Sequence, residues 1–574
     1  MRAIWRDDRL ARFATLAAAT ALVLVLSSAE GDAFRLVRQT WETSESVRNA
    51  AAALAIWGVA WLADTQLPLA SWRPGWARVW NRAWRALGWP VAVGAAIFSL
   101  GLLGYALRWG LRLDAPMVLY PARLFITGQR LFYRDLVEFN QPATYVLYGL
   151  MDRLIGSEVG YRVVDASLVV ISGVAARRAF RLRQPAAAPI AVALFVVTHL
   201  YATGVDCLQR EMFVLALSML TGAQLSRGRW ALAAACATFA FWMKFHAALL
   251  FAPFVWDALQ RTSAPVARRG LATFVGILVG SSVAIVLALA ACGALPAWLE
   301  MVGEYLPLYG RMSGTWNFSV DASNLWTRRM WLFLQPSTHA PILGVLLIPP
   351  VLLRAFRRGA ARESSAGPAI GFYLGSLAYV LIQGTFWHYQ SIPEFFAIGI
   401  LCAILVTDLP DRAPLSLVPR VALAGLVAYP IAGPSAWNAI AWDATGQNDE
   451  AVAMAEELRA EVPPGETVQP LETVTGAVDA MWRADVPMAT PFVFDIVFYY
   501  RPDLPVIRRW RQRFLDELDR SRPYFILEST GGYRARPYGP GSDNTFPELD
   551  AWIRANYDDY RDQGSFRWWR RRAR

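Results

Sequence analysis

The sequence contains very little lysine, histidine and cysteine. Lys244 is the single lysine among 56 basic residues, and there are 4 histidines. The 4 cysteines stand at no paired or metal-ligand spacing, so neither a disulfide framework nor a zinc site is expected (Cys207, Cys236, Cys292, Cys402). Charged residues make up only 18% of the chain, and the arginines stand in clusters between apolar runs. The net charge of +11 therefore indicates loops that face anionic lipid, and no nucleic-acid partner is expected.

Apolar residues, in contrast, make up 55% of the chain and recur in runs too long and too frequent for a soluble core. This pattern predicts a polytopic α-helical membrane protein. About thirteen spans are expected, at 11–29, 47–66, 90–111, 157–176, 187–203, 209–225, 229–244, 246–259, 271–292, 341–356, 366–384, 393–407 and 420–434. The first run is interpreted as a retained anchor, because no convincing small-residue cleavage motif follows it.

The arginine clusters predict the topology of these spans. Placing basic loops inside puts the N-terminus and the loop 67–89 in the cytoplasm, so the third helix emerges outside just before Asp114. The cluster from Arg177 to Arg183 requires a cytoplasmic turn, which leaves room for a single span between it and Asp114. The stretch NQPATYVLYGLMDRLIG is therefore expected to lie as a helix at the outer interface. An odd number of spans places the residues from 435 onwards outside.

Three regions are expected. Residues 1–89 form an N-terminal two-helix extension, 90–434 the transmembrane catalytic region, and 435–574 a soluble extracytoplasmic α/β domain. In the last region NDEAVAMAEELRAEV, RRWRQRFLDELDRS and FPELDAWIRANY have helical patterns, and PYFILEST has the pattern of a buried strand. The GGYRARPYGPGS segment is interpreted as a flexible loop. The RWWRRRAR tail is interpreted as a solvated basic end, with contact to anionic lipid as the alternative.

Asp114 begins the most informative loop, LDAPMVLYPARLFITGQRLFYRDLVEFNQP. Its first half has the pattern of an interfacial helix that Gly128 ends or bends. If a sugar is transferred from a lipid phosphate to a hydroxyl, a carboxylate must take the proton of that hydroxyl, and Asp114 suits this role. The alternative is that Asp114 caps the interfacial helix. Asp135 and Glu138, three residues apart, form a second carboxylate pair on one face.

Two further outer turns carry basic residues. In FWMKFHAAL, Lys244 and His246 lie at the outer end of an apolar hairpin, and phosphate binding is favoured over snorkelling of Lys244 to the interface. In GVDCLQREMF, Arg210 is expected to clamp a phosphate with Glu211 orienting it. A structural ion pair between Arg210 and Glu211 is the equal alternative.

Aromatic and imidazole side chains stand at the remaining outer segments. In QGTFWHYQSIPEF, His388 has the pKa of a general base but is better suited to bind a sugar or phosphate by hydrogen bonds, next to Tyr389. The long loop 293–340 contains aromatic and acidic residues that would line an acceptor groove or anchor the loop at the interface (Trp298, Glu300, Glu304, Tyr305, Tyr309).

The first external loop also carries a spaced pattern, G-x-x-x-x-Y-x-D-x-x-x-x-N-x-P, formed by Gly128, Tyr133, Asp135, Asn140 and Pro142. A loop that starts with Asp and continues with this pattern and an aromatic helix resembles the GT-C glycosyltransferases. These include protein mannosyltransferases and bacterial lipid A aminoarabinose transferases. The resemblance covers about 90–434 and the external α/β region, and the first two helices look like an addition.

The resemblance implies inverting transfer of a sugar from a polyprenyl-phosphate donor to a glycan or lipid-linked acceptor. It implies Asp114 as the general base and basic residues that bind the phosphate. Because Ala115 and Pro116 follow Asp114 where a second acidic residue is commoner, Asp135 remains a competing base. Phosphate contacts are expected from Lys244, Arg210 and His246, and donor or acceptor contacts from Glu138, Asn140, Tyr133, Glu211, His388 and Tyr389.

The function expected from these observations is a membrane glycosyltransferase in the bacterial cytoplasmic (inner) membrane, active at its outer face. One alternative is a polysaccharide polymerase or O-antigen ligase, in which external Arg and His residues dominate. Another is a lipid-linked glycan transporter or flippase, for which acidic residues inside the spans are expected. No cofactor is indicated, and because the sequence has no dense acidic cluster, a divalent metal is left open.

Overall fold

A computed structural model describes residues 73–107, 109–111, 114–203, 208–312, 347–348, 351, 365–383, 388–407, 449–472, 475–530 and 545–573. The predicted helices at 11–29, 47–66 and 420–434 lie outside these residues, as does most of 341–356. The predicted number of thirteen spans therefore stays a prediction.

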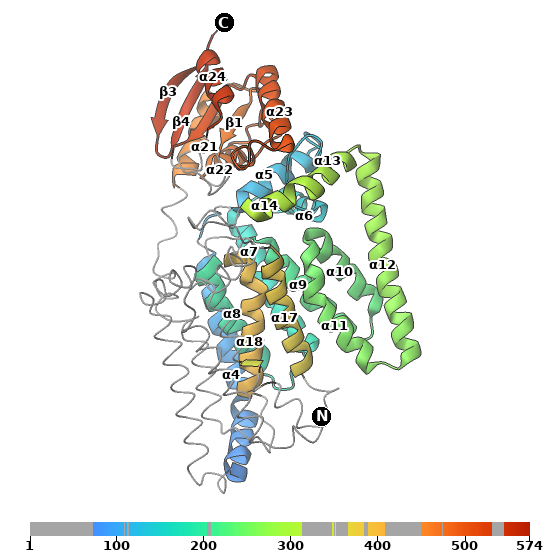
Figure 1. Cartoon of the computed structure of the whole chain (residues 1–574). Helices are drawn as coiled ribbons and strands as arrows, with labels where there is room; N and C mark the ends of the chain where they lie inside the picture. Colours follow the sequence, from blue (N-terminus) through green and yellow to red (C-terminus); the bar gives the residue numbers. More distant parts are fainter. Residues whose placement is uncertain are drawn as a thin grey trace, which may run out of the picture.

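Nine helices of the described residues form the body of the molecule (Figure 1). They are α4 (Arg73–Ala106), α7 (Glu158–Ala179), α8 (Ala187–Thr203), α9 (Arg210–Leu225), α10 (Trp230–Met243), α11 (Ala248–Arg261), α12 (Ala264–Ala291), α17 (Ala366–Gln383) and α18 (Ile392–Thr407). Within the described part of the chain, five helical segments are long and apolar enough to cross a membrane: Gly88–Ala106, Glu158–Ala179, Ala264–Ala291, Ala366–Gln383 and Tyr389–Thr407. The chain is thus a helical membrane protein.

The predicted bounds of α7 to α11, α17 and α18 are confirmed to within a few residues. The prediction that 67–89 is a loop is wrong from Arg73 on, because α4 begins there and runs through Pro90 without a break. Arginine, alanine and tryptophan all allow a helix. The end of the apolar run therefore does not end the helix.

The bundle is organised around α9, most of whose side chains are buried. It packs against α7, α10 and α11, while α8 packs against α4 and α18. At Gly375 on α17 the backbone comes so close to α11 that an added Cβ would lie 2.2 Å from the Leu249 carbonyl oxygen. Glycine is required there because any side chain would separate the two helices.

Shorter helices cover one end of this body (Figure 1). They are α5 (Asp114–Ile126), α6 (Pro142–Leu154), α13 (Leu295–Glu300), a π-helical turn (Met301–Tyr305) and α14 (Leu306–Met312). Gly128 has φ +74° and follows the end of α5, which confirms its predicted role in ending that helix. The described part of the long segment predicted as the loop 293–340 is helical from Leu295 to Met312.

An α/β unit lies beyond these short helices (Figure 1). It comprises α21 (Asp449–Glu461), β1 (Val468–Leu471), α22 (Ala477–Ala484), α23 (Pro505–Ser521), β2 (Phe525–Ser529), α24 (Pro547–Asn556), β3 (Tyr557–Gln563) and β4 (Phe566–Arg571). The sheet order is β1-β2-β4-β3; β1 and β2 are parallel, and the other pairs are antiparallel. The predicted helices and buried strand in this region are present, whereas the predicted boundary at 435 and the GGYRARPYGPGS loop lie outside the described residues.

The basic tail is a strand, so its interpretation as a solvated end is wrong. β4 lies inside the sheet, between β2 and β3, and both Phe566 and Trp568 are fully buried. The alternation of apolar and basic residues in FRWWRR places Phe566 and Trp568 on the core face of the strand. The many arginines make the segment look like a charged tail in the sequence. Arginine can also occupy the solvent face of a strand, so its presence does not exclude a strand.

Candidate functional site

Asp114 is the first residue of α5, one of the short helices between the bundle and the α/β unit (Figure 1). Its side chain is partly buried. Its charge interacts with those of Arg210 and Lys244, and also with the phenol groups of Tyr309 and Tyr389. A carboxylate in the first turn of a helix is also favoured by the helix dipole, so the capping role is compatible with this position.

Arg210 and Lys244 reach the same end of the bundle from two neighbouring helices. Arg210 is the first residue of α9, Lys244 directly follows α10, and the two helices run antiparallel and pack together. The N-terminus of a helix such as α9 carries a positive partial charge, which favours an anion in front of it. The charges of both side chains interact with that of Asp114, and Arg210 begins α9.

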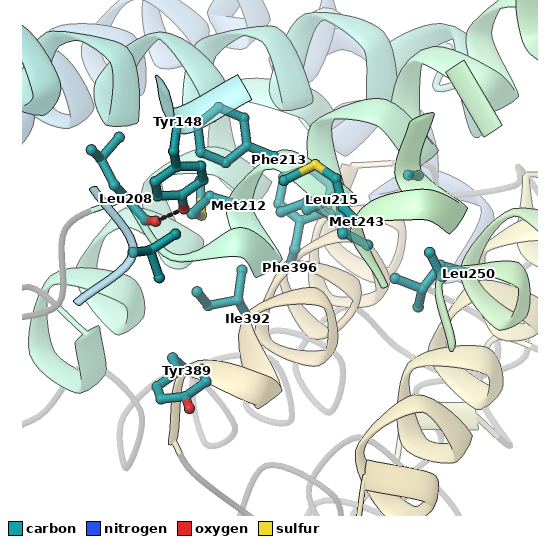
Figure 2. Close-up of a cluster of buried hydrophobic side chains, with 14 of the residues drawn as sticks. Tyr148, Leu208, Met212, Phe213, Leu215, Met243, Leu250, Tyr389, Ile392 and Phe396 are labelled. Atoms are coloured by element: carbon teal, nitrogen blue, oxygen red, sulfur yellow. Dashed lines mark hydrogen bonds between the residues drawn. The ribbon is translucent and has the colours of Figure 1, made fainter. Parts of the chain in front are cut away.

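Tyr148 on α6 fixes the chain just before α9. Its hydroxyl donates to the Leu208 carbonyl oxygen, and Leu208 has φ +58°. Figure 2 shows this bond within a cluster of apolar side chains from α9 and α18, including Met212 and Phe396. The sharp turn that starts α9 is thus held by a buried contact to the short helices.

Glu211 pairs with Lys244, and its charge also interacts with that of its neighbour Arg210. The Lys244 Nζ atom donates to the Glu211 carboxylate and, at 2.8 Å, to Oε1 of Gln383. The Glu211 side chain is fully buried, and the Lys244 side chain is 13% exposed. Lys244 does not snorkel to the interface, because it is held within the bundle by residues of α9 and α17.

Glu138 belongs to the same environment. It is fully buried, and its Oε2 atom accepts a hydrogen bond of 2.6 Å from the Tyr145 hydroxyl. Burial raises the pKa of Glu138 to about 8, although the Tyr145 hydrogen bond and the charge of Arg210 oppose this shift. Glu138 is therefore mostly protonated at neutral pH and can both donate and accept hydrogen bonds.

Tyr133 and Asn140 shape the loop that carries Glu138. The Tyr133 hydroxyl donates to the Asn140 carbonyl oxygen at 2.6 Å, and the Asn140 N–H donates to the Tyr145 hydroxyl at 3.2 Å. Tyr133 itself has φ +65°, and Pro142 begins α6. Several residues of the spaced pattern thus have structural roles in the loop.

Asp135 makes local contacts. Its carboxylate pairs with Arg134 at 2.8 Å and accepts a hydrogen bond of 3.1 Å from the Leu131 N–H. The hydrogen bond from Arg134 lowers the pKa of Asp135. A carboxylate whose pKa is lowered by its neighbour in a turn is a weaker base, so Asp135 is less favoured than Asp114 for this role.

His246 and Tyr389 lie near the cluster. Burial, with the charge of Lys244, lowers the pKa of His246 to about 4, so it is neutral at pH 7 and supplies no charge for a phosphate. Tyr389 is buried, and its phenol interacts with the charges of Asp114 and Arg210. His388 begins a short 3-10 helix (His388–Ser391), and its side chain lies outside the described ones.

Most residues proposed for an acceptor groove contact other parts of the chain instead. Trp298 Nε1 donates to Gln141 at 3.1 Å, Arg509 of α23 pairs with Glu300 and Glu304, and Tyr305 packs on Trp510. They join α13 and the π-helical turn to the rest of the molecule. Tyr309 is the exception, since its phenol interacts with the charges of Asp114 and Arg210.

Sequence reasoning missed Gln383, Tyr145 and Tyr148, which bind Lys244, Glu138 and the start of α9. Each lies in an apolar helix at a distance of 7 to 139 residues along the chain from its partner. Only packing of the helices brings them to the site. Among the described residues, no group of three or more His, Cys, Asp or Glu side chains is placed to hold a metal ion.

The fold of the bundle, with the short helices over one end and the α/β unit beyond them, is similar to that of solved structures. ArnT from Cupriavidus metallidurans in the apo state is similar over 84% of this chain and 98% of its own, with a TM-score of 0.50 and 13% identity. ArnT from the same organism bound to undecaprenyl phosphate has a TM-score of 0.49 and 14% identity, and the similarity covers 84% of this chain and 98% of that one. The archaeal oligosaccharyltransferase AglB from Archaeoglobus fulgidus, in complex with an inhibitory peptide and a dolichol-phosphate, gives 0.45, over 84% and 74%, at 11% identity. No protein-family model and no curated protein matches the chain.

Proposed function

We propose that this chain is an inverting glycosyltransferase that transfers a sugar from a polyprenyl-phosphate donor to a hydroxyl of a cell-envelope glycan or lipid-linked acceptor. The observation that carries the proposal is the electrostatic interaction of one carboxylate, Asp114, with two cations, Arg210 at the start of α9 and Lys244 at the end of α10. A base for the acceptor and a positive site for the leaving phosphate are the two groups that this reaction requires.

In the proposed reaction the acceptor oxygen attacks the anomeric carbon of the donor sugar. The new bond joins this carbon to the acceptor oxygen, and the bond between the carbon and the phosphate oxygen breaks. Asp114 takes the acceptor proton, and the polyprenyl phosphate leaves with the electron pair of the broken bond. Arg210 and the N-terminus of α9 stabilise the added negative charge, together with Lys244. A single displacement inverts the anomeric centre.

Buried polar atoms near this cluster support a hydroxyl-rich ligand. Glu138 Oε1, Gln209 Nε2 and Glu211 Oε2 are buried and have no hydrogen-bond partner within the part of the chain that the structure describes. Leaving such atoms without partners is costly, and a sugar with several hydroxyl groups would satisfy them. Tyr309 and Tyr389 add phenol groups next to Asp114.

The surroundings of the cluster favour a lipid donor. Helix α12 exposes apolar side chains such as Val279 and Leu287, as expected for a helix that contacts lipid. A polyprenyl chain can reach the bundle from the bilayer, whereas the acceptor would approach from the side of the α/β unit. We infer that this side faces outwards from the bacterial inner membrane, with residues 90–434 as the catalytic region and 435–574 as an extracytoplasmic domain.

The test uses the purified full-length chain in nanodiscs with a panel of undecaprenyl-phosphate hexoses and pentoses. Release of undecaprenyl phosphate is measured with and without a mixture of envelope glycans. We expect at least one donor to be cleaved, and Asp114→Asn to reduce this rate by about 100-fold or more, because general-base catalysis contributes about 10²–10⁴-fold. Asp135→Asn is the matched control and is expected to retain most activity. Normal turnover in Asp114→Asn would show that Asp114 is not the base.

A further inference from the structure

Asp152 on α6 is a buried carboxylate that collects hydrogen bonds from three other elements. Its Oδ2 atom accepts from Arg123 Nε of α5 at 2.6 Å, and Oδ1 accepts from Arg123 Nη2 at 3.0 Å. Oδ1 also accepts from the Tyr161 hydroxyl of α7 at 2.8 Å and from Trp482 Nε1 of α22 at 2.9 Å. One side chain thus joins three helices of the membrane region to the α/β unit.

The α/β unit makes further hydrogen bonds and a cation–π contact with α5. Arg123 Nη1 donates to the Trp482 carbonyl oxygen at 2.7 Å, and the guanidinium lies 5.1 Å from the centre of the Trp482 ring. One turn earlier on α5, the Tyr120 hydroxyl donates to the Val486 carbonyl oxygen at 2.7 Å. These contacts fix both the rotation and the position of α5 along its axis.

The same segment of the α/β unit continues along the loop that leads to Glu138. Arg130 donates to the Met488 carbonyl oxygen at 3.1 Å, and the Val137 N–H donates to the Pro491 carbonyl oxygen at 2.8 Å. Residues 482–491 therefore run beside both α5 and the following loop. The two segments that present Asp114 and Glu138 are held by one strip of chain.

Helix α5 needs such support. It has only 13 residues and contains Pro121, which lacks the N–H that would bond to the preceding turn. A helix of this length is marginally stable without tertiary contacts. Arg123 lies about 13 Å along the axis from Asp114, at about 1.5 Å per residue, so a tilt at Arg123 displaces Asp114.

We propose that Asp152 is a positioning residue that, through Arg123 and Trp482, sets α5 and hence Asp114 against the phosphate-binding side chains. The role of Asp114 in this statement rests on the proposed function. The α/β unit is then a brace for the reaction centre and not only an accessory domain. A displacement of about 1 Å of a catalytic group can reduce a rate by about 100-fold. Loss of the Asp152 contacts should therefore lower kcat.

The test compares Asp152→Asn with Asp257→Asn in the full-length chain in nanodiscs. Asp152→Asn keeps the shape of the side chain, but the new amide cannot accept from both Arg123 nitrogens. Asp257 makes a comparable pair with Arg181 at 2.8 Å, beyond the other end of α7. Two quantities are measured: hydrogen exchange of the peptides that cover 114–126 and 482–491, and kcat and KM for release of undecaprenyl phosphate from the donor that the wild type cleaves.

For Asp152→Asn we expect faster exchange confined to these two peptides and a fall in kcat of about 10- to 100-fold, with KM within about twofold. Asp257→Asn should change neither. If Asp152→Asn does not fold, Trp482→Phe removes the indole N–H that donates to Oδ1, keeps a smaller aromatic ring beside Arg123, and should give the same pattern at smaller amplitude.

Three results would contradict the proposed positioning role of Asp152. They are unchanged hydrogen exchange in 114–126, an increase in exchange spread over the whole bundle, and a rise in KM with constant kcat. If the wild type cleaves no donor, the proposed function fails, while the exchange measurement still decides whether Asp152 fixes α5.

Discussion

Replacing Glu211 with glutamine releases the Lys244 ammonium from its buried carboxylate partner while keeping the size of the side chain. In the resting protein this carboxylate neutralises Lys244 and lies next to Arg210 at the start of α9. If Lys244 binds a phosphate, Glu211 competes with that phosphate for the ammonium. Glu211→Gln should therefore make the protein less stable and yet bind undecaprenyl phosphate more tightly.

The two effects have estimable magnitudes. Removing one partner of a buried ion pair costs about 3–5 kcal/mol, and the lower end applies because Gln383 still accepts from Lys244 at 2.8 Å. Removal of a negative charge about 6 Å from the phosphate, on the other side of the shared ammonium, contributes about 3 kcal/mol at an effective dielectric constant of about 20, which is about 100-fold in affinity. Lys244→Met removes a charged hydrogen bond of about 1.5–3 kcal/mol and should weaken binding by about 10- to 150-fold.

Affinity is measured by thermophoresis of the full-length chain in nanodiscs, and stability by thermal unfolding of the same samples. Asp257→Asn is the control, because it breaks an ion pair with Arg181 that is remote from the cluster, so it should lower stability and leave affinity unchanged. Weaker binding by Glu211→Gln, or equal binding by Lys244→Met and the wild type, would refute the assignment of Lys244 to the phosphate.

Further outcomes follow from burial and close packing. Glu138 holds a proton in the folded chain up to about pH 8, whereas an unfolded chain releases it near pH 4.5. The contribution of this proton to stability should therefore decline above pH 4.5 and be lost as pH rises through about 8. Activity should fall through about pH 8 as well. Glu138→Gln should remove this dependence, which a pH series of unfolding temperature and rate will check, and a fall near pH 8 that persists in this variant would assign it to another group. Trp568→Ala removes a fully buried side chain and should destabilise the α/β unit by about 3–5 kcal/mol, seen as faster hydrogen exchange in β2 and β4; unaltered exchange would contradict the strand assignment. Gly375→Ala should lower the unfolding temperature, because the new Cβ would meet the Leu249 carbonyl oxygen, and a normal temperature would mean that α17 and α11 are not in close contact.

Periodicity made most of the membrane helices predictable. Long apolar runs bounded by arginines predicted the ends of α7 to α11, α17 and α18 to within a few residues. This works because polarity changes where a helix leaves the lipid. The prediction of a solvated basic tail was wrong because the pattern of its apolar residues was hidden by arginines. In FRWWRR only Phe566 and Trp568 are fully buried, and the arginines between and after them hide the strand pattern that β4 forms between β2 and β3.

The site divides in the same way. Asp114, Arg210 and Lys244 could be selected from the sequence, since charged residues at the ends of apolar runs are rare and costly. Their pairing could not. No pattern along the chain indicates that Glu211 binds Lys244, that Asp135 turns to Arg134, or that Gln383 completes the cluster.

The chain by itself thus determined the class of protein, the helices and the residue types available for chemistry, because hydrophobicity and charge act locally along the sequence. Tertiary structure decided which carboxylate meets which cation, because pairing depends on how helices far apart in sequence pack. It also decided the protonation of Glu138, through burial, and the contact between the α/β unit and α5, through Asp152 and Trp482. These properties exist only once water has been excluded from the contacts between folded elements.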